Sequence, residues 1–220
     1  MKNTIKPLFA DMFCPHYCLS CGAVGRILCE CCRKNMKVPL GRCLVCGEIL
    51  VNDICPNCEL PFSKQFCIGE RVGLLKESVN VYKYNSVRAC SDVLCDLILD
   101  SVDLKKDDVL VPLPTISRHV RERGFGHMEY LAKLLAKRSP ARLGRVLKRA
   151  TNTVQVGSDS EKRKAQAKVA YALCGDIDTS LNYYLLDDVW TTGSSMTEAS
   201  KILHSAGVQY VNAILIAKTV

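Results

Sequence analysis

The sequence predicts an α/β protein in which a small cysteine-rich segment precedes a larger unit built on a parallel sheet. Strand-like and helix-like patterns alternate from residue 66 onward, as expected for an α/β domain. One apolar run ends in two adjacent acids and continues into a Gly/Ser/Thr loop and an amphipathic run, an order typical of a phosphate-binding connection. Eleven of the fourteen cysteines lie between Cys14 and Cys67. We therefore expect two domains, residues 1–65 and residues 66–220, the second with its own core.

Hydrophobic periodicity predicts the elements of the second domain. Apolar residues at helical spacing, such as Leu94, Leu97 and Ile98, indicate helices, and short apolar runs indicate strands. In chain order we first expect a strand or hairpin arm at 68–75, a helix at 86–102 and a buried strand at 109–113. A long amphipathic helix within 121–137 should follow, with Tyr130, Leu131, Leu134 and Leu135 on its apolar face. We then expect short strands at 146–147 and 169–173 around a polar loop at 151–168, a strand at 183–189, a helix from Ser195 and a terminal strand at 211–217.

The composition limits the kind of protein that this chain can be. With 220 residues, 48% of them hydrophobic, and a mean hydropathy of +0.06, the chain can bury a full core. No apolar run is long enough to cross a bilayer, and Met1 to Asp11 lacks the apolar segment of a secretory signal, so we expect a cytoplasmic protein. The net charge of +8 favours anionic partners such as nucleotides, pyrophosphate, nucleic acid or an acidic membrane surface.

Four C-x-x-C pairs in the first domain predict structural zinc. The pairs are Cys18/Cys21, Cys29/Cys32, Cys43/Cys46 and Cys55/Cys58. Four thiolates in a tetrahedron suit Zn²⁺, and so short a segment has too little core to fold without a metal. Disulfides are the competing interpretation, but they are rare in the cytosol, and four pairs in a row exceed what a redox dithiol uses.

The spacing leaves the pairing of the cysteines open. Sequential pairing gives one site from the first two pairs and another from the last two, whereas a crossed arrangement joins the first pair with the third and the second with the fourth. Cys14, His16, Cys31 and Cys67 are substitute ligands, although each is more simply a non-ligand. We expect one or two structural zinc ions, and favour two.

The stretch after the apolar run 183–186 has the residues of a phosphate site. Asp187 and Asp188 come first, and paired acids at the carboxyl end of a strand can accept hydrogen bonds from a sugar diol or hold Mg²⁺. A helix N-terminus follows, with unpaired amides that favour an anion. The competing interpretation is an ordinary strand-to-helix turn with solvated acids and capping hydroxyls. The expected phosphate loop consists of Thr191, Thr192, Gly193, Ser194 and Ser195.

Three arginines follow the expected strand at 109–113. Arg118, Arg121 and Arg123 come shortly after Pro114, so we expect them near the carboxyl edge of the same sheet. Guanidinium groups there can bind a pyrophosphate bidentately. The competing interpretation is a basic helix start exposed to water, which is electrostatically unfavourable.

The acid pair followed by Thr-Thr-Gly-Ser-Ser closely resembles the phosphoribosyl pyrophosphate (PRPP) motif of type I phosphoribosyltransferases. The resemblance implies a type I phosphoribosyltransferase-like parallel sheet flanked by helices. It also implies that Asp187 and Asp188 bind the ribose hydroxyls and that residues 191–195 hold the 5′-phosphate.

A wider resemblance covers nearly the whole chain. The strings V-P-L-P and R-E-R-G-F, with Arg149, Thr153-Val154-Gln155 and Arg163, are similar to the ComF family of competence-associated phosphoribosyltransferase-like proteins. That family also has an N-terminal zinc ribbon or knuckle, and usually a Lys-aromatic pair where this chain has Lys83-Tyr84. The resemblance implies PRPP and Mg²⁺ as ligands, a closing loop at 151–165 from which Arg163 contacts phosphate, and a link to DNA uptake in natural transformation.

Two departures from the family pattern concern the acceptor side of the site. Gly126-His127 stands where the family commonly has Asn-Gln, and Gln166 stands where it usually has Asn. His127 could be a general base or a contact to an acceptor, but a surface histidine on a helix is the favoured interpretation.

Two functional hypotheses follow. The first is a cytoplasmic PRPP-binding protein, in which Asp187 and Asp188 serve a transfer of phosphoribose to a nitrogen acceptor. The alternative is a non-enzymatic module that handles single-stranded DNA or binds the DNA-uptake machinery, in which the PRPP pocket is a sensor or a relic. DNA contacts would then rest on the zinc segment and on Lys133, Lys137 and Arg138.

Overall fold

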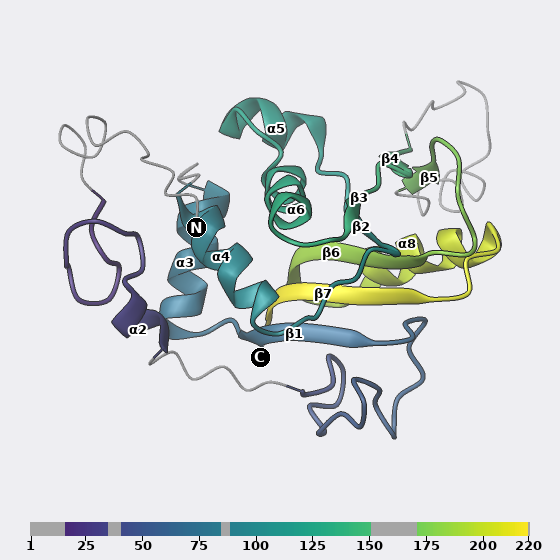
Figure 1. Ribbon diagram of the computed structural model, residues 1–220, viewed down its shortest axis with the longest axis horizontal. Helices are drawn as coiled ribbons and strands as arrows, with labels where there is room; N and C mark the ends of the chain where they lie inside the picture. The colour runs from purple at the N-terminus through teal and green to yellow at the C-terminus, as the bar shows by residue number, and fades with distance from the viewer. Residues whose placement is uncertain (1–15, 35–40, 85–88, 151–170, 220) are drawn as a thin grey trace, which may run out of the picture.

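The protein is built around a five-stranded parallel sheet with the strand order β1-β7-β6-β2-β3 (Figure 1). The computed structural model describes residues 16–34, 41–84, 89–150 and 171–219. The strands of this sheet are β1 (Gln65–Glu70), β2 (Asp108–Pro112), β3 (Arg142–Leu143), β6 (Asn182–Trp190) and β7 (Val211–Lys218). A separate antiparallel pair consists of β4 (Leu147–Arg149) and β5 (Tyr171–Leu173). This architecture confirms the expected α/β class.

Helices cover both faces of the sheet because its strands are apolar on both sides. Alternate residues of β6 enter different core clusters: Tyr184 and Leu186 pack with one set of helices, and Tyr183 and Leu185 pack with α8 (Ser194–Ser205). The first set consists of α3 (Gly73–Tyr84), α4 (Cys90–Leu99) and α6 (His127–Arg138). Among the described residues, none of the helices has the length and apolar character of a membrane span.

The cysteine-rich segment joins both faces of this core. Leu28, 2% exposed, packs in the cluster with α3, α4 and α6, and Leu44, 1% exposed, packs in the cluster with α8. Figure 1 accordingly shows the purple segment around α2 (Glu30–Lys34) and the blue segment before β1 well apart. The proposed boundary at residue 65 stays a prediction, but the two halves of the segment are anchored separately.

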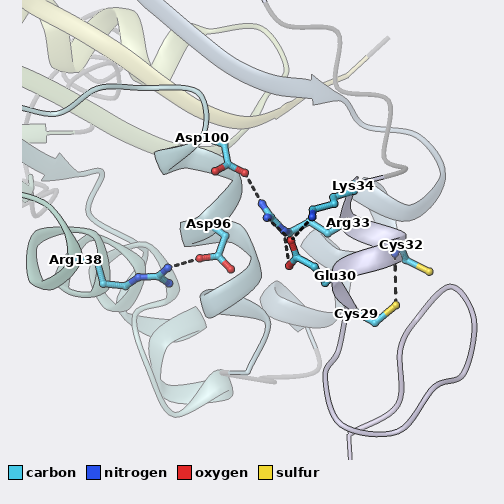
Figure 2. A network of polar contacts seen from close by, with 8 residues as sticks. All are labelled: Cys29, Glu30, Cys32, Arg33, Lys34, Asp96, Asp100 and Arg138. Carbon is cyan, nitrogen blue, oxygen red and sulfur yellow. Dashed lines mark hydrogen bonds and ion pairs between the residues drawn. The ribbon is translucent and has the colours of Figure 1, made fainter. Parts of the chain in front are cut away.

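Polar contacts strengthen each anchor. Arg33 of α2 forms ion pairs with Glu30 and with Asp100, the residue that follows α4 (Figure 2). On the other face, the backbone N–H of Leu44 donates to Gln65 Oε1 at 3.0 Å, and Lys218 Nζ donates to the carbonyl oxygen of Cys43 at 3.2 Å.

The structure corrects two of the predicted elements. The expected strand at 68–75 ends at Glu70, and residues 73–84 form α3, which the periodicity analysis missed. The long helix expected within 121–137 is two helices, α5 (Ser117–Arg123) and α6, separated at Gly124, whose φ of 75° ends α5. Tyr130 is 37% exposed, so it does not belong to the buried face of α6. The polar loop at 151–168 lies outside the described residues.

Candidate functional site

A cavity of about 730 Å³ opens at the carboxyl edge of the sheet. Parallel strands end together there, so side chains far apart in the sequence meet. We call this space the edge cavity. Its lining comes from the ends of β1, β2 and β6, from α3, α5 and the starts of α6 and α8, and from the β4–β5 pair.

Four of the residues predicted to bind phosphoribose lie on this lining: Asp187, Asp188, Thr191 and Ser195. The loop also contains two exposed residues, Thr192 and Ser194, whose hydroxyl oxygens lie 3.0 Å apart. The acids end β6, and Ser194 begins α8, so the predicted order of strand, acids, loop and helix is present. Ser195, in the first turn of α8, therefore borders the same space as the two carboxylates.

Gly193 makes this turn possible for two physical reasons. Its φ of 73° lies in the left-handed region, which other residues rarely adopt. A Cβ at this position would also lie 2.1 Å from Cζ2 of Trp190, so the indole ring occupies the space that a side chain would need. The loop can follow β6 this closely only with glycine at position 193.

The two acids have opposite electrostatic surroundings. Burial raises the pKa of Asp187 to about 7, and the neighbouring charge of Asp188 adds to the shift. Burial alone would raise the pKa of Asp188 as well, but the hydrogen bond from His127 and the charge of Lys83 lower it to about 2. Asp188 is therefore a fully ionised, paired carboxylate, whereas Asp187 is close to its titration point at neutral pH.

His127 corrects a sequence interpretation. The favoured expectation was a surface histidine, but His127 is 4% exposed and its Nε2 lies 2.8 Å from Asp188 Oδ2. Its place at the start of α6, directly after Gly126, brings it to the end of β6, where Asp188 lies. The sequence signal that could have found this contact is the departure from Asn-Gln at that position.

The cations on the edge cavity are not the ones that the sequence favoured. Its lining contains Arg71, which follows β1, Lys83 of α3 and Arg149 of β4. Lys83 Nζ lies 2.6 Å from Asp188 Oδ2, and the Arg149 guanidinium lies 4.9 Å from the centre of the Tyr171 ring. Arg71 Nη2 donates to Asn80 Oδ1 at 2.8 Å, while its buried Nε has no hydrogen-bond partner in the described part of the chain. Arg71, Lys83 and Arg149 thus supply positive charge to the edge cavity from three different parts of the chain.

The predicted pyrophosphate arginines lie elsewhere or cannot be described. Arg118 and Arg121 are exposed on α5 and do not line the edge cavity, and Arg118 pairs with Glu122 at 2.7 Å. The side chain of Arg123 and the whole of Arg163 lie outside the described residues. Arg71 is the residue that sequence reasoning missed, because a single arginine after a short strand carries no distinctive pattern.

Eight cysteines form two separate clusters, each with its candidate ligand atoms within 4.8 Å of one another. The pairing is sequential, so the crossed arrangement is wrong. The first cysteine cluster consists of Cys18, Cys21, Cys29 and Cys32, and the second consists of Cys43, Cys46, Cys55 and Cys58. Among the substitutes, Cys31 and Cys67 belong to neither cluster, His16 is not among the grouped ligands, and Cys14 lies outside the described residues.

The geometry of both clusters fits tetrahedral zinc. A ZnS₄ centre with Zn–S distances of about 2.3 Å separates its sulfurs by about 3.8 Å. Cys21 Sγ lies 3.7 Å from Cys29 Sγ, and Cys46 Sγ lies 3.6 Å from Cys55 Sγ. Both clusters can therefore bind a structural zinc ion.

Hydrogen bonds from backbone amides stabilise the thiolate form of one cysteine in each cluster. Against the effect of burial, N–H donors from Cys21 and Cys29 lower the pKa of Cys18 to about 6. Donors from Val45 and Cys46 likewise lower the pKa of Cys43 to about 7. Thiolate is the form that binds zinc, so the local backbone favours metal binding.

Two curated proteins resemble this chain over most of its length. It is 27% identical over 204 residues to Competence protein F of Haemophilus influenzae, covering 84% of this chain and 87% of that protein. It is 27% identical over 201 residues to Competence protein ComFC of Bacillus subtilis, covering 82% of this chain and 79% of that protein. No family model matches the chain.

Proposed function

We propose that the chain is a ComF-family protein that binds PRPP in the edge cavity and serves a competence-related function. The observation that supports the ligand best is the meeting of Asp187, Asp188, Thr191 and Ser195 with three cations around one space of about 730 Å³. PRPP carries a ribose diol, a 5′-phosphate at one end and a pyrophosphate at the other. This lining has acceptors for the diol and donors or cations for the phosphate and the pyrophosphate.

Each part of PRPP has a partner in this proposal. The 5′-phosphate lies at the N-terminus of α8, where Thr191 and Ser195 border the cavity. The ribose diol donates to the acids at the end of β6. The pyrophosphate lies toward Thr115 and His119, which also line the space, with charge supplied by the surrounding cations. Arg118, Arg121, Arg123 and Arg163 remain predictions for this phosphate end.

Mg²⁺ suits the acids for a chemical reason. The buried Asp187 carboxylate, whose pKa is raised to about 7, and the carboxylate of Asp188 are hard oxygen donors at the place where the sugar would lie. When bound, the ion would neutralise part of the charge on PRPP.

The proposed reaction is transfer of phosphoribose to a nitrogen nucleophile. The nitrogen forms a bond to C1 of PRPP, the C1–O bond to pyrophosphate breaks, and pyrophosphate leaves with the electron pair while the nitrogen releases its proton to solvent. The residues of the chain bind the ribose and the leaving group and position them for this displacement.

The test of ligand binding is calorimetric titration of the zinc-loaded protein with PRPP and Mg²⁺. We expect the double substitution Asp187→Asn with Asp188→Asn to weaken binding by about 1–3 kcal/mol for each lost charged hydrogen bond. Asp103→Asn is the matched control, because Asp103 is exposed and does not line the cavity. Absence of binding by the unmodified protein, or full affinity in the double variant, would contradict the proposal.

Pyrophosphate release then separates the enzyme from the sensor. PRPP-bound protein incubated with a panel of purine and pyrimidine bases should release pyrophosphate with at least one of them. Binding of PRPP without release in any mixture would favour the non-enzymatic alternative.

Single-stranded DNA is the second candidate ligand, supported by the names of the two relatives and by the net charge of +8. Of the helix bases proposed for it, Lys133 pairs with Glu129 and Arg138 with Asp96, so Lys137 is the strongest candidate contact. Affinity measured against salt concentration should fall log-linearly, with a slope about one smaller in Lys137→Ala. DNA binding without PRPP binding would reverse the order of the two candidates.

A further inference from the structure

His127 and Asp188 form a buried pair at the edge cavity, although 61 positions separate them in the sequence. His127 is the first residue of α6, and Asp188 lies near the carboxyl end of β6. Both are almost fully buried, at 4% and 5% exposure, and their side chains lie 2.8 Å apart. A charge-assisted hydrogen bond in such surroundings is screened little by water, so it restrains both groups strongly.

Two consecutive residues of α3 support this pair from the other side. Lys83 Nζ lies 2.6 Å from Asp188 Oδ2, the same oxygen that His127 contacts. Tyr82 donates its hydroxyl hydrogen to the carbonyl oxygen of His127, and its ring stands edge-on to the imidazole with centroids 6.0 Å apart. The end of α3 therefore fixes the acid through Lys83 and fixes the histidine through Tyr82.

The position of both acids follows from these contacts. Because Lys83 and His127 share Oδ2, they fix the plane of the carboxylate of Asp188 and hence the place of its Oδ1. The backbone N–H of Asp188 also donates to Asp187 Oδ1 at 2.9 Å, which connects the first acid to the second. A change at His127 would therefore alter the direction in which both carboxylates present their oxygens.

We propose that His127 is a positioning residue of the ligand site, acting through Asp188 to hold the two acids in the arrangement that receives a ribose diol. This inference rests on the proposed binding of PRPP. A histidine that only filled the core would stabilise the fold, but its effect on ligand affinity would not depend on whether position 188 carries a carboxylate.

Glutamine and alanine at position 127 separate these two roles. The amide nitrogen of glutamine can donate to a carboxylate, as imidazole does, whereas alanine has no donor. His127→Gln should therefore keep Asp188 in place and His127→Ala should not. His127→Asn gives a third variant, which is polar but too short to make the same contact.

The experiment is calorimetric titration of the full-length, zinc-loaded protein with PRPP and Mg²⁺, with thermal unfolding of each variant as the check on folding. We expect His127→Ala to lower affinity about tenfold, as loss of an orienting partner typically does. His127→Gln should stay within about threefold of the unmodified protein, and the effect of His127→Ala should vanish in the Asp188→Asn background. His204→Ala is the matched control, because His204 contacts Val208 and does not line the cavity.

The outcomes separate this inference from the proposed function. If the unmodified protein does not bind PRPP, the proposed function is wrong and the role of His127 with it. If that protein binds, but His127→Ala binds equally well or loses the same factor in the Asp188→Asn background, only the positioning role is overturned. Should His127→Ala fail to fold, His127→Asn replaces it, with the same expected loss and the same dependence on Asp188.

Discussion

Asp187 and Asp188 are adjacent in the sequence, yet their surroundings in the folded protein shift their pKa values in opposite directions. Asp188 is stabilised as an anion by His127 and Lys83, whereas burial makes ionisation of Asp187 unfavourable. Asp187 is therefore a residue whose ionised form lowers the free energy of unfolding. Residues that lower stability are common at binding sites, because their side chains are arranged to contact a ligand and not to stabilise the fold.

This difference predicts a pH-dependent gain of stability in Asp187→Asn. The folded pKa of about 7 lies above the ordinary value of 3.8, so ionisation costs nothing below the lower value and its full amount above the higher one. We expect the free energy of unfolding of Asp187→Asn to exceed that of the unmodified protein by about 1–4 kcal/mol at pH 8 and by less at pH 5. Urea denaturation at both pH values measures this, and an equal difference at each would contradict it.

At the scale of elements, the connection from β6 to α8 was the most predictable part of the molecule. Its apolar run, acids, glycine and hydroxyls each obey a local rule, so their order could be inferred without knowing the rest of the fold. Helix α3 was not predictable in the same way. Its first residues, Gly73 and Leu74, belong to a short apolar run at 72–75 that follows β1 after Arg71, and a run of that length does not distinguish a strand from the start of a helix.

The same connection predicts unequal effects of two glycine substitutions. Gly193 and Gly207 both have positive φ, but an added Cβ would lie 2.1 Å from the ring of Trp190 at the first site and 3.2 Å from Thr179 Cγ2 at the second. We expect Gly207→Ala to lower the free energy of unfolding by about 1–2 kcal/mol. Gly193→Ala should cost about 1–3 kcal/mol more because of the overlap.

The fluorescence of Trp190 is a direct readout, because this is the only tryptophan of the chain. Its emission should change in Gly193→Ala and stay unchanged in Gly207→Ala. Equal destabilisation by both substitutions would mean that the loop can move away from the ring.

The cysteine clusters predict a metal stoichiometry. Cys43→Ser should reduce the zinc content from two ions to one, and should lower thermal stability because Leu44, the next residue, is part of the core. Cys31→Ser is the matched control, since Cys31 belongs to neither cluster and two ions should remain. Metal analysis by mass spectrometry tests both variants, and an unchanged zinc content in Cys43→Ser would show that its cluster is not a zinc site.

At the scale of the whole molecule, the edge cavity depends on segments that only the complete fold brings together. The sequence placed Asp187, Asp188, Thr191 and Ser195 because they are close neighbours in one motif. It could not place His127 beside Asp188 or Arg71 on the same lining, because those contacts depend on where α6 packs and on where β1 lies in the strand order of the sheet. Long-range packing decides such contacts, and local pattern carries no information about it.

The two anchors of the cysteine-rich segment predict additive effects on stability. Leu28→Ala and Leu44→Ala should each lower the free energy of unfolding by about 2–5 kcal/mol, because each creates a cavity in a different face of the core. Since the sites share no partners, the double variant should show the sum. Val45→Ala is the control, because Val45 is exposed. If neither leucine mattered to residues 66–220, the cysteine-rich segment would be energetically independent of them.

The short strand β3 limits how this sheet can meet another molecule. It ends one side of the sheet with only 2 residues, Arg142 and Leu143. An outer strand with many unpaired N–H and C=O groups is a template on which a foreign strand can add, and this is a common start of aggregation. Beyond β3 only a brief stretch of backbone is available for such pairing. On this side, the protein is protected against edge-to-edge self-association by strand length alone.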